Sequence, residues 1–422
     1  MNRSTSGKAR LAVAAVAAMA TLSLTACGSS TSSTSSPASS DSMAGMTSTG
    51  SGVAGAAATT TAAAGLRATL TDLLTQHVYL AGIALKTAVD KGGNLKDPAV
   101  VAAVTTLDGN SVALSKAIGS VYPAAEKPFL QSWRQHIGYF VNYTLGEATH
   151  NTAMADQAKS DLNGYRTAFG QLINSVVPEL PAAAVAQELI PHVQTLLDTI
   201  DALVTGKGDA FALLSKAADH MPMTASILAT GIAQDKHLAG DPNDAASGLR
   251  SGLTYLLDSH VDLAGIALTQ AVSKGGNLKD PTVVAAVNAL DANSVALSKA
   301  VGSVYPAAET PFLQSWRQHI GYFVNYTLGK ATGNTAMADK AKSDLNGYRT
   351  SFGQLINSVV PQLPADAVAQ ELVPHVQTLL TTIDALVAGN PQVFGDLEMA
   401  AMHMPGTATI LAGGIAANKN LG

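Results

Sequence analysis

The chain has 422 residues and a net charge of −5, with only 13% charged and 5% aromatic side chains. It contains no basic block of the kind that nucleic-acid binding requires, so that class of function is excluded. Ala and Leu, both strong helix formers, are abundant. We therefore expect an all-α protein, long enough for two or three domains.

The first residues are typical of an export signal. Arg3, Lys8 and Arg10 precede an apolar run, residues 11–24, that is too short to span a bilayer. The sequence "LTAC" then ends at Cys27, the only cysteine, and resembles the bacterial lipobox, in which the cysteine is lipidated. We expect a signal peptide over residues 1–26 and an exported protein, held at the outer face of the cytoplasmic membrane by a lipid on Cys27. The alternative is an ordinary signal peptide with an incidental cysteine.

Residues 27–64 consist mainly of Ser, Thr, Gly and Ala. A segment of this composition cannot bury enough apolar surface to fold by itself. We expect a flexible tether between the lipid anchor and the folded part.

The rest of the chain is a tandem repeat. Shifted by 183 residues it matches itself without a gap, at roughly three quarters of positions, and "SWRQHIGYFVNYT" occurs in full at 132–144 and 315–327. A period of this size indicates two domains rather than a solenoid. We assign repeat 1 to residues 65–238, repeat 2 to residues 249–422, and a linker to residues 239–248, which contain Gly, Pro, Asn and Asp.

Within one repeat the apolar spacing and the breakers predict six helices. Asp97-Pro98 and Asp280-Pro281 have the form of an N-cap followed by a proline in the first turn. The predicted architecture is two tandem six-helix up-and-down bundles that fold independently. The predicted helices of repeat 1 are 66–90, 98–121, 124–149, 152–176, 181–205 and 209–235.

Eight of the ten histidines form four equivalent pairs across the repeats. Each lies among Leu, Val, Ile, Ala or aromatic residues at helical spacing, which predicts a core-facing side chain on a separate helix. A buried imidazole needs hydrogen-bond partners or a metal. Either the histidines converge on one site, or each is satisfied separately by a residue such as Asn110, Asn163 or Tyr143. The pairs are His77/His260, His136/His319, His192/His375 and His220/His403.

The tripeptide "HMP" returns unchanged at 220–222 and 403–405, although residues 207–219 differ strongly from their counterparts. We interpret Pro222 as a helix-interior proline, which would be costly to retain for packing alone. This favours a binding role for the histidine and methionine of the motif.

Familiar catalytic motifs are missing: there is no HExxH, no GxSxG and no phosphate loop, and the chain lacks the two Glu-x-x-His motifs that a di-iron bundle needs. Imidazole with thioether on an exported chain suits copper best. Haem is a second alternative, non-covalent because CxxCH is absent, and a structural or partner-binding lipoprotein without a cofactor is a third. The candidate ligands are His77, His136, His192, His220 and Met221, with His260, His319, His375, His403 and Met404 in repeat 2.

The pattern "HVxLAGIAL … DxNSVAL … WRxHIGYFVxY … HV … HM" resembles a family of bacterial exported helical repeats that are often labelled copper-amine-oxidase-like. The resemblance covers both repeats and implies an exported all-helical protein. Copper amine oxidases make their quinone from the tyrosine of Asn-Tyr-Asp/Glu, whereas this chain has Asn142-Tyr143-Thr144 and Asn325-Tyr326-Thr327. Because the acidic residue is missing, we expect no oxidase activity. Because no carboxylate pair, Ser/His/Asp set or activated nucleophile is recognisable, we expect no other enzymatic activity.

Overall fold

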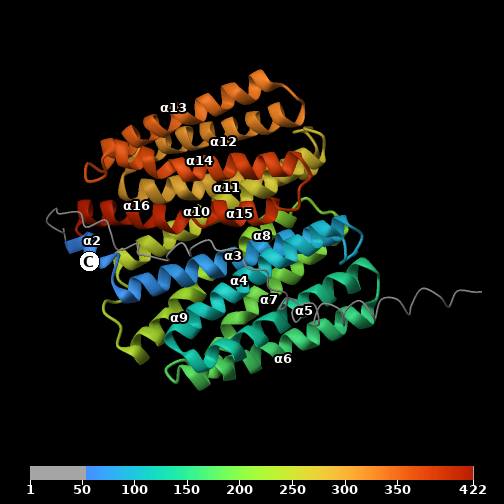
Figure 1. Cartoon of the computed structure of the whole chain (residues 1–422). Coiled ribbons are helices and arrows are strands. Elements are labelled where there is room, and N and C mark those ends of the chain that lie inside the picture. Colours follow the sequence, from blue (N-terminus) through green and yellow to red (C-terminus); the bar gives the residue numbers. More distant parts are fainter. Residues whose placement is uncertain (1–53, 422) are drawn as a thin grey trace, which may run out of the picture. The chain divides into compact units, whose positions relative to one another are not determined.

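The computed structural model describes residues 54–421, and these residues form helices and turns without a strand (Figure 1). The all-α prediction is thus confirmed. The signal peptide, Cys27 and most of the expected tether lie outside the described residues. After a short α2 (Ala54–Ala58), repeat 1 comprises α3 (Ala62–Asp90), α4 (Pro98–Val121), α5 (Glu126–Ala148), α6 (Thr152–Val176), α7 (Ala182–Thr205), α8 (Ala210–Ala218) and α9 (Met221–Lys236). Repeat 2 comprises α10 (Ala245–Ser273), α11 (Pro281–Val304), α12 (Glu309–Ala331), α13 (Thr335–Val359), α14 (Ala365–Val387), α15 (Val393–Ala401) and α16 (Met404–Lys419).

Each repeat therefore has seven helices, not six, because the expected segment 209–235 is two helices. The break falls at Asp219 and His220, and Pro222 lies in the first turn of α9. A proline is tolerated there, since its missing N–H would have no partner in any case. Our interpretation of Pro222 as a helix-interior proline was wrong. The predicted tether, residues 27–64, extends too far toward the C-terminus, because α2 and the start of α3 lie within residues 54–64.

The predicted caps are confirmed. Asp97 accepts a hydrogen bond from the Ala99 amide at 2.9 Å, and Asp280 accepts one from the Thr282 amide at 2.9 Å. In both cases a proline occupies the first helical position. These caps fix where α4 and α11 begin, and so fix the direction in which the chain returns after α3 and α10.

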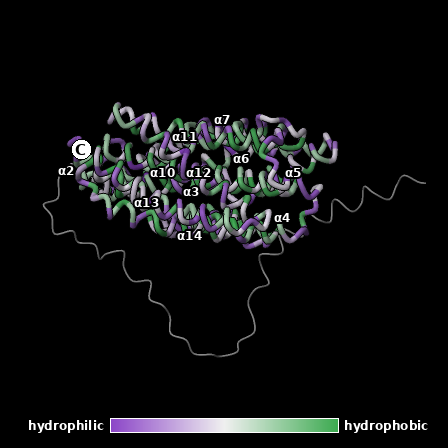
Figure 2. The backbone as a smooth tube through the Cα atoms, turned by 90° about the horizontal axis from the view of Figure 1, so that it is seen from above, coloured by the Kyte–Doolittle hydropathy of each residue, from purple (hydrophilic) through white to green (hydrophobic). Residues whose placement is uncertain are grey.

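In each repeat the first long helix is central. Helix α3 packs against α4 and α9 and also touches α5, α7 and α8. Hydrophobic and hydrophilic residues alternate along the helices, as the colouring of Figure 2 shows. Because α3 has neighbours on several sides, residues on more than one of its faces are buried, among them Leu70, Val78 and Tyr79. A histidine on this helix can therefore meet side chains from several others.

The repeats contact each other along α3 and α10 (Figure 1). Two equivalent arginines cross this contact. Arg67 donates to the Pro242 carbonyl oxygen at 2.7 Å, and Arg250 donates to the Thr59 carbonyl oxygen at 2.9 Å. The expected linker is thus bound to repeat 1, and α10 begins within it at Ala245. Independent folding of each repeat stays a prediction.

None of the described helices is both long enough and apolar enough to cross a membrane.

Candidate metal centre

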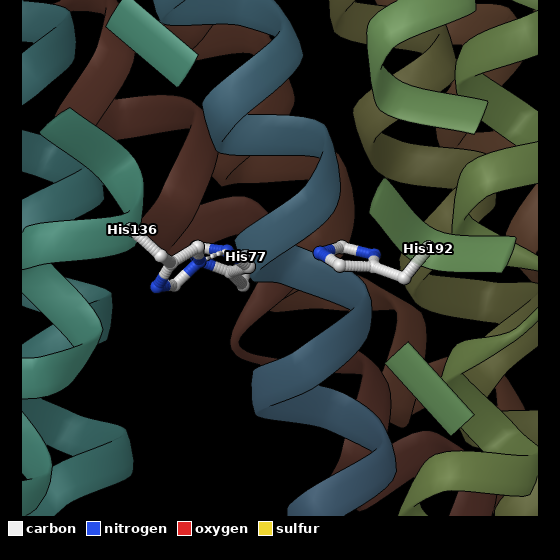
Figure 3. Close-up of side chains that lie close together, drawn as sticks. All are labelled: His77, His136 and His192. Carbon is white, nitrogen blue, oxygen red and sulfur yellow. Dashed lines mark hydrogen bonds between the residues drawn. The ribbon is translucent and has the colours of Figure 1, made fainter. Parts of the chain in front are cut away.

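Three histidines from three helices meet in the core of repeat 1. They are His77 of α3, His136 of α5 and His192 of α7, and we call them triad 1. One ring nitrogen of each lies within 4.8 Å of those of the other two, and the Nε2 atoms of His77 and His136 are 3.3 Å apart. Figure 3 shows the three side chains extending toward one another from their separate helices.

The same arrangement recurs in repeat 2, where triad 2 consists of His260, His319 and His375. The Nε2 atoms of His260 and His319 are 3.2 Å apart. The ring centroids of the first two histidines are 5.3 Å apart in triad 1 and 5.2 Å apart in triad 2. The two sites are therefore equivalent in geometry as well as in sequence.

An aromatic wall surrounds the triad and excludes water. Trp133 lies one turn before His136 on α5, and its ring is 4.6 Å from the His136 ring and 4.8 Å from the His77 ring. Phe140, one turn after His136, lies 6.3 Å from His192, and Tyr165 of α6 stacks on His136 at 4.9 Å. The i−3 and i+4 spacing on α5 places the wall and the ligand on one face. The role of Tyr165 was missed, because it lies on a different helix from His136 and the spacing within α5 does not indicate it.

A helix-interior proline precedes the third histidine. Pro191 lies inside α7 directly before His192, and its equivalent Pro374 precedes His375. A proline there has no N–H to donate to the Gln187 carbonyl, which loosens the helix locally. Thr195 Oγ1 donates to the Pro191 carbonyl oxygen at 2.7 Å within the same turn. The helix-interior proline of this region is therefore Pro191 and not Pro222.

Burial keeps the triad uncharged. The pKa of His77 is lowered to about 3, first by burial and then by the neighbouring His192. The pKa of His192 is lowered to about 4 by burial and by His220, and that of His136 falls well below its usual value by burial and by the other two histidines. Neutral imidazole is the form that binds a metal, so near neutral pH each of the three rings has one nitrogen with a lone pair to give.

None of the three residues expected to satisfy separate histidines bonds to a histidine. Asn110 Nδ2 donates to the Leu73 carbonyl oxygen, Asn163 Oδ1 accepts from Arg166, and Tyr143 donates to Asp201. The Nδ1 atoms of His77 and His192 are buried without a partner among the described residues. Each such group costs about 1–3 kcal/mol. Separate satisfaction of each histidine is therefore not what the structure shows.

The fourth histidine of each set stays outside the triad. His220 is half-buried and precedes α9, and His403 holds the same position before α16. Met221, by contrast, is buried and lines a cavity of about 30 Å³ together with His77 and His192. The structure thus brings together three of the four candidate histidines, and Met221 lines the same cavity as two of them.

Comparisons with known proteins add no assignment. No family model, no curated protein and no solved structure matches this chain. The functional assignment therefore depends on the geometry of the two triads.

Proposed function

We propose that this protein binds one transition-metal ion in each repeat, with copper as the best-suited metal. The observation that carries the proposal is the convergence of three neutral, buried imidazoles whose polar atoms have almost no other partner. Three imidazoles form a common first shell for Zn²⁺ and copper, at nitrogen–metal distances of about 2 Å. The observed Nε2–Nε2 separation of 3.3 Å is compatible with two nitrogens around one ion.

Copper is favoured over zinc by the sulfur ligand nearby. Met221 lines the same cavity as His77 and His192, and its equivalent Met404 is also buried. Thioether is a soft ligand that selects Cu(I), whereas zinc sites take thiolate, imidazole or carboxylate. Mixed imidazole and thioether ligation therefore argues for copper.

Haem fits less well. The cavity beside triad 1 has a volume of about 30 Å³, whereas pockets for ligands of drug-like size hold roughly 300–1,000 Å³. A porphyrin would require α3, α5 and α7 to separate. The aromatic contacts of Trp133, Phe140 and Tyr165 with the triad oppose that separation.

The proposal also places the two sites outside the cell. The charged start, the apolar run and "LTAC" support lipid attachment at Cys27, with the tether holding the repeats away from the membrane. The role is binding of metal rather than catalysis. The competing role is that of a structural or partner-binding lipoprotein without a cofactor.

The test is metal analysis of the full chain, followed by separate titrations of the metal-free protein with Cu(I), Cu(II) and Zn(II). We expect about two copper ions per chain, and their loss in a variant carrying His136→Asn and His319→Asn, because each substitution removes one of three ligands. The matched control carries His150→Asn and His237→Asn. These two exposed histidines have positive φ angles of 55° and 49°, which Asn tolerates, and repeat 2 already has Asn420 at the second position.

Copper binding that survives in the His136→Asn/His319→Asn variant would refute the proposed site. A chain that binds none of the three ions, and whose melting temperature does not change when they are added, would favour the structural role.

A further inference from the structure

One histidine of the "HMP" motif is left over once the triad is assigned. His220 directly precedes α9, and its Nε2 atom is buried without a hydrogen-bond partner among the described residues. It lies close enough to His192 to lower the pKa of that residue, and His403 acts on His375 in the same way. An imidazole nitrogen without a partner, next to the proposed metal site but outside it, can serve as an additional ligand for a metal ion.

The residues near His220 in the sequence range from exposed to buried. In repeat 1, Met223 is 61% exposed, His220 is half-buried, and Met221 is 3% exposed and lines the cavity of His77 and His192. These three residues lie within the first turn of α9 and the residue before it, so one short segment runs from solvent to the triad.

Repeat 2 shows the same gradation with a different set of methionines. Met402 is 65% exposed and Met399 is 51% exposed, His403 is half-buried, and Met404 is 2% exposed. Four methionines are exposed among the described residues, and three of them belong to these two segments; the fourth is Met337. Three of the four exposed methionines thus lie within four residues of His220 or His403 along the chain.

We infer that the "HMP" segment of each repeat is an uptake site, which takes a soft monovalent cation, Cu(I), from solvent and passes it to the triad. The inference depends on the proposed function. Exposed thioethers hold Cu(I) weakly, His220 or His403 adds an imidazole, and three imidazoles with a buried thioether hold it more strongly. Thioether and imidazole are both ligands that bind Cu(I) as it is, so the ion moves inward without a change of oxidation state.

The two uptake sites are not equal. Met402 of repeat 2 corresponds to Asp219 of repeat 1, which instead accepts a hydrogen bond from Tyr255. Met399 corresponds to Lys216. Repeat 1 therefore offers one exposed thioether and repeat 2 offers two. We expect the full chain to load in two phases, with triad 2 filling first.

The experiment measures the rate of loading separately from the amount bound. The metal-free full chain is mixed, without oxygen, with Cu(I) held by a weak coloured chelator, and the absorbance of the chelator is followed over time. One variant carries His220→Asn and His403→Asn, and another carries Met223→Leu, Met399→Leu and Met402→Leu. Met337→Leu is the control, because Met337 is an exposed methionine outside both segments.

We expect both variants to load about tenfold more slowly than the unmodified chain, a loss typical of residues that support a metal site from outside its first shell. The final amount should remain two ions per chain, and the control should load at the unmodified rate. Unchanged rates in both variants would overturn the inference while leaving the proposed function intact. Loss of capacity in the histidine variant would also overturn it, because His220 would then be a ligand of the bound ion. An unmodified chain that binds Cu(II) or Zn(II) but takes up no Cu(I) would also overturn the inference, whereas a chain that binds none of the three ions would refute the proposed function itself.

Discussion

At the scale of single residues, the triad histidines make the free energy of unfolding depend on pH. Their pKa values in the folded chain lie below the unfolded value of about 6.5. The stability they allow is therefore fully present above about pH 6.5 and is lost as pH falls toward the folded values, about 3 for His77 and about 4 for His192.

We expect the metal-free chain to lose up to about 1.4 kcal/mol of unfolding free energy per pH unit for each triad histidine below pH 6.5. Denaturant unfolding at a series of pH values measures this slope. The His136→Asn/His319→Asn variant should show a shallower slope, while His150→Asn should leave it unchanged, because His150 is exposed. An equal slope in all three proteins would show that the histidines are not buried as described.

At the scale of helices, the position of α7 relative to α6 depends on a glycine. A Cβ built on Gly170 of α6 would lie 2.3 Å from the Ala182 carbonyl oxygen at the start of α7, and Gly353 has the same close approach, 2.2 Å, to Ala365. Since α7 carries His192, this contact helps to set the distance of the third ligand from the other two.

We expect Gly170→Ala to destabilise the chain by about 1–3 kcal/mol, because the added methyl group forces α7 away. It should also weaken metal binding in repeat 1 alone. Gly164→Ala is the matched control on the same helix: nothing lies within 4 Å of its Cβ, so the change should be neutral or stabilise by up to about 1 kcal/mol. Similar unfolding curves and metal affinities for the two variants would contradict this account of the α6–α7 contact.

At the scale of the whole molecule, the two repeats differ in sequence at the contact between α3 and α10. Ten pairs of equivalent residues differ between α3 and α10, and five of them are spaced as one helix stripe. In the contact itself, Thr71 Oγ1 and Ser251 Oγ are 2.7 Å apart, and Asp258 is fully buried. The residues of one repeat thus face different residues of the other. The five pairs of this stripe are Ala68/Ser251, Asp72/Tyr255, Thr75/Asp258, Gln76/Ser259 and Tyr79/Asp262.

Buried carboxyl groups lie in this contact. Asp258 and Asp262 are at most 1% exposed, and their carboxyl oxygens have no hydrogen-bond partner within residues 54–421. Burial raises the pKa of Asp258 well above its usual value, and the charges of Asp72 and Asp262 raise it further. The pKa of Asp72 is raised to about 7, mainly by burial. None of the ion pairs among the described residues includes these carboxyl groups.

A raised carboxyl pKa gives stability that is fully present below the unfolded value, about 3.8, and is lost as pH rises through the folded value. We therefore expect Asp258→Asn, which copies the protonated carboxyl group, to raise the melting temperature more at about pH 8 than at about pH 5. Asp198→Asn, on α7, is a control whose effect should not depend on pH in this way. A lower melting temperature of Asp258→Asn at pH 8, together with stabilisation of the unmodified chain by Ca²⁺ or Mg²⁺, would show that a cation rather than protons neutralises the cluster.

Local features of the sequence were sufficient for the helices and for the burial of the triad. The Asp97 cap, the breakers and the apolar spacing around His136 act within a few residues of the chain, so they can be identified without knowledge of the partners. The same holds for Trp133 and Phe140, which lie one turn on either side of His136. Because the two repeats are so similar in sequence, a site predicted for one repeat is also predicted for the other.

The tertiary structure alone decided which histidines meet. The four histidines of one repeat all lie on apolar stripes. A stripe indicates only which face of a helix is buried, and not at which height along the bundle the side chain meets those of other helices. The break before α9 moved His220 out of the triad, and the packing of α3 at the centre brought His77 within reach of both α5 and α7. The contact between α3 and α10 was likewise not foreseen, because long-range packing depends on the shapes of two surfaces at once, and the sequence of either one specifies only half of that fit.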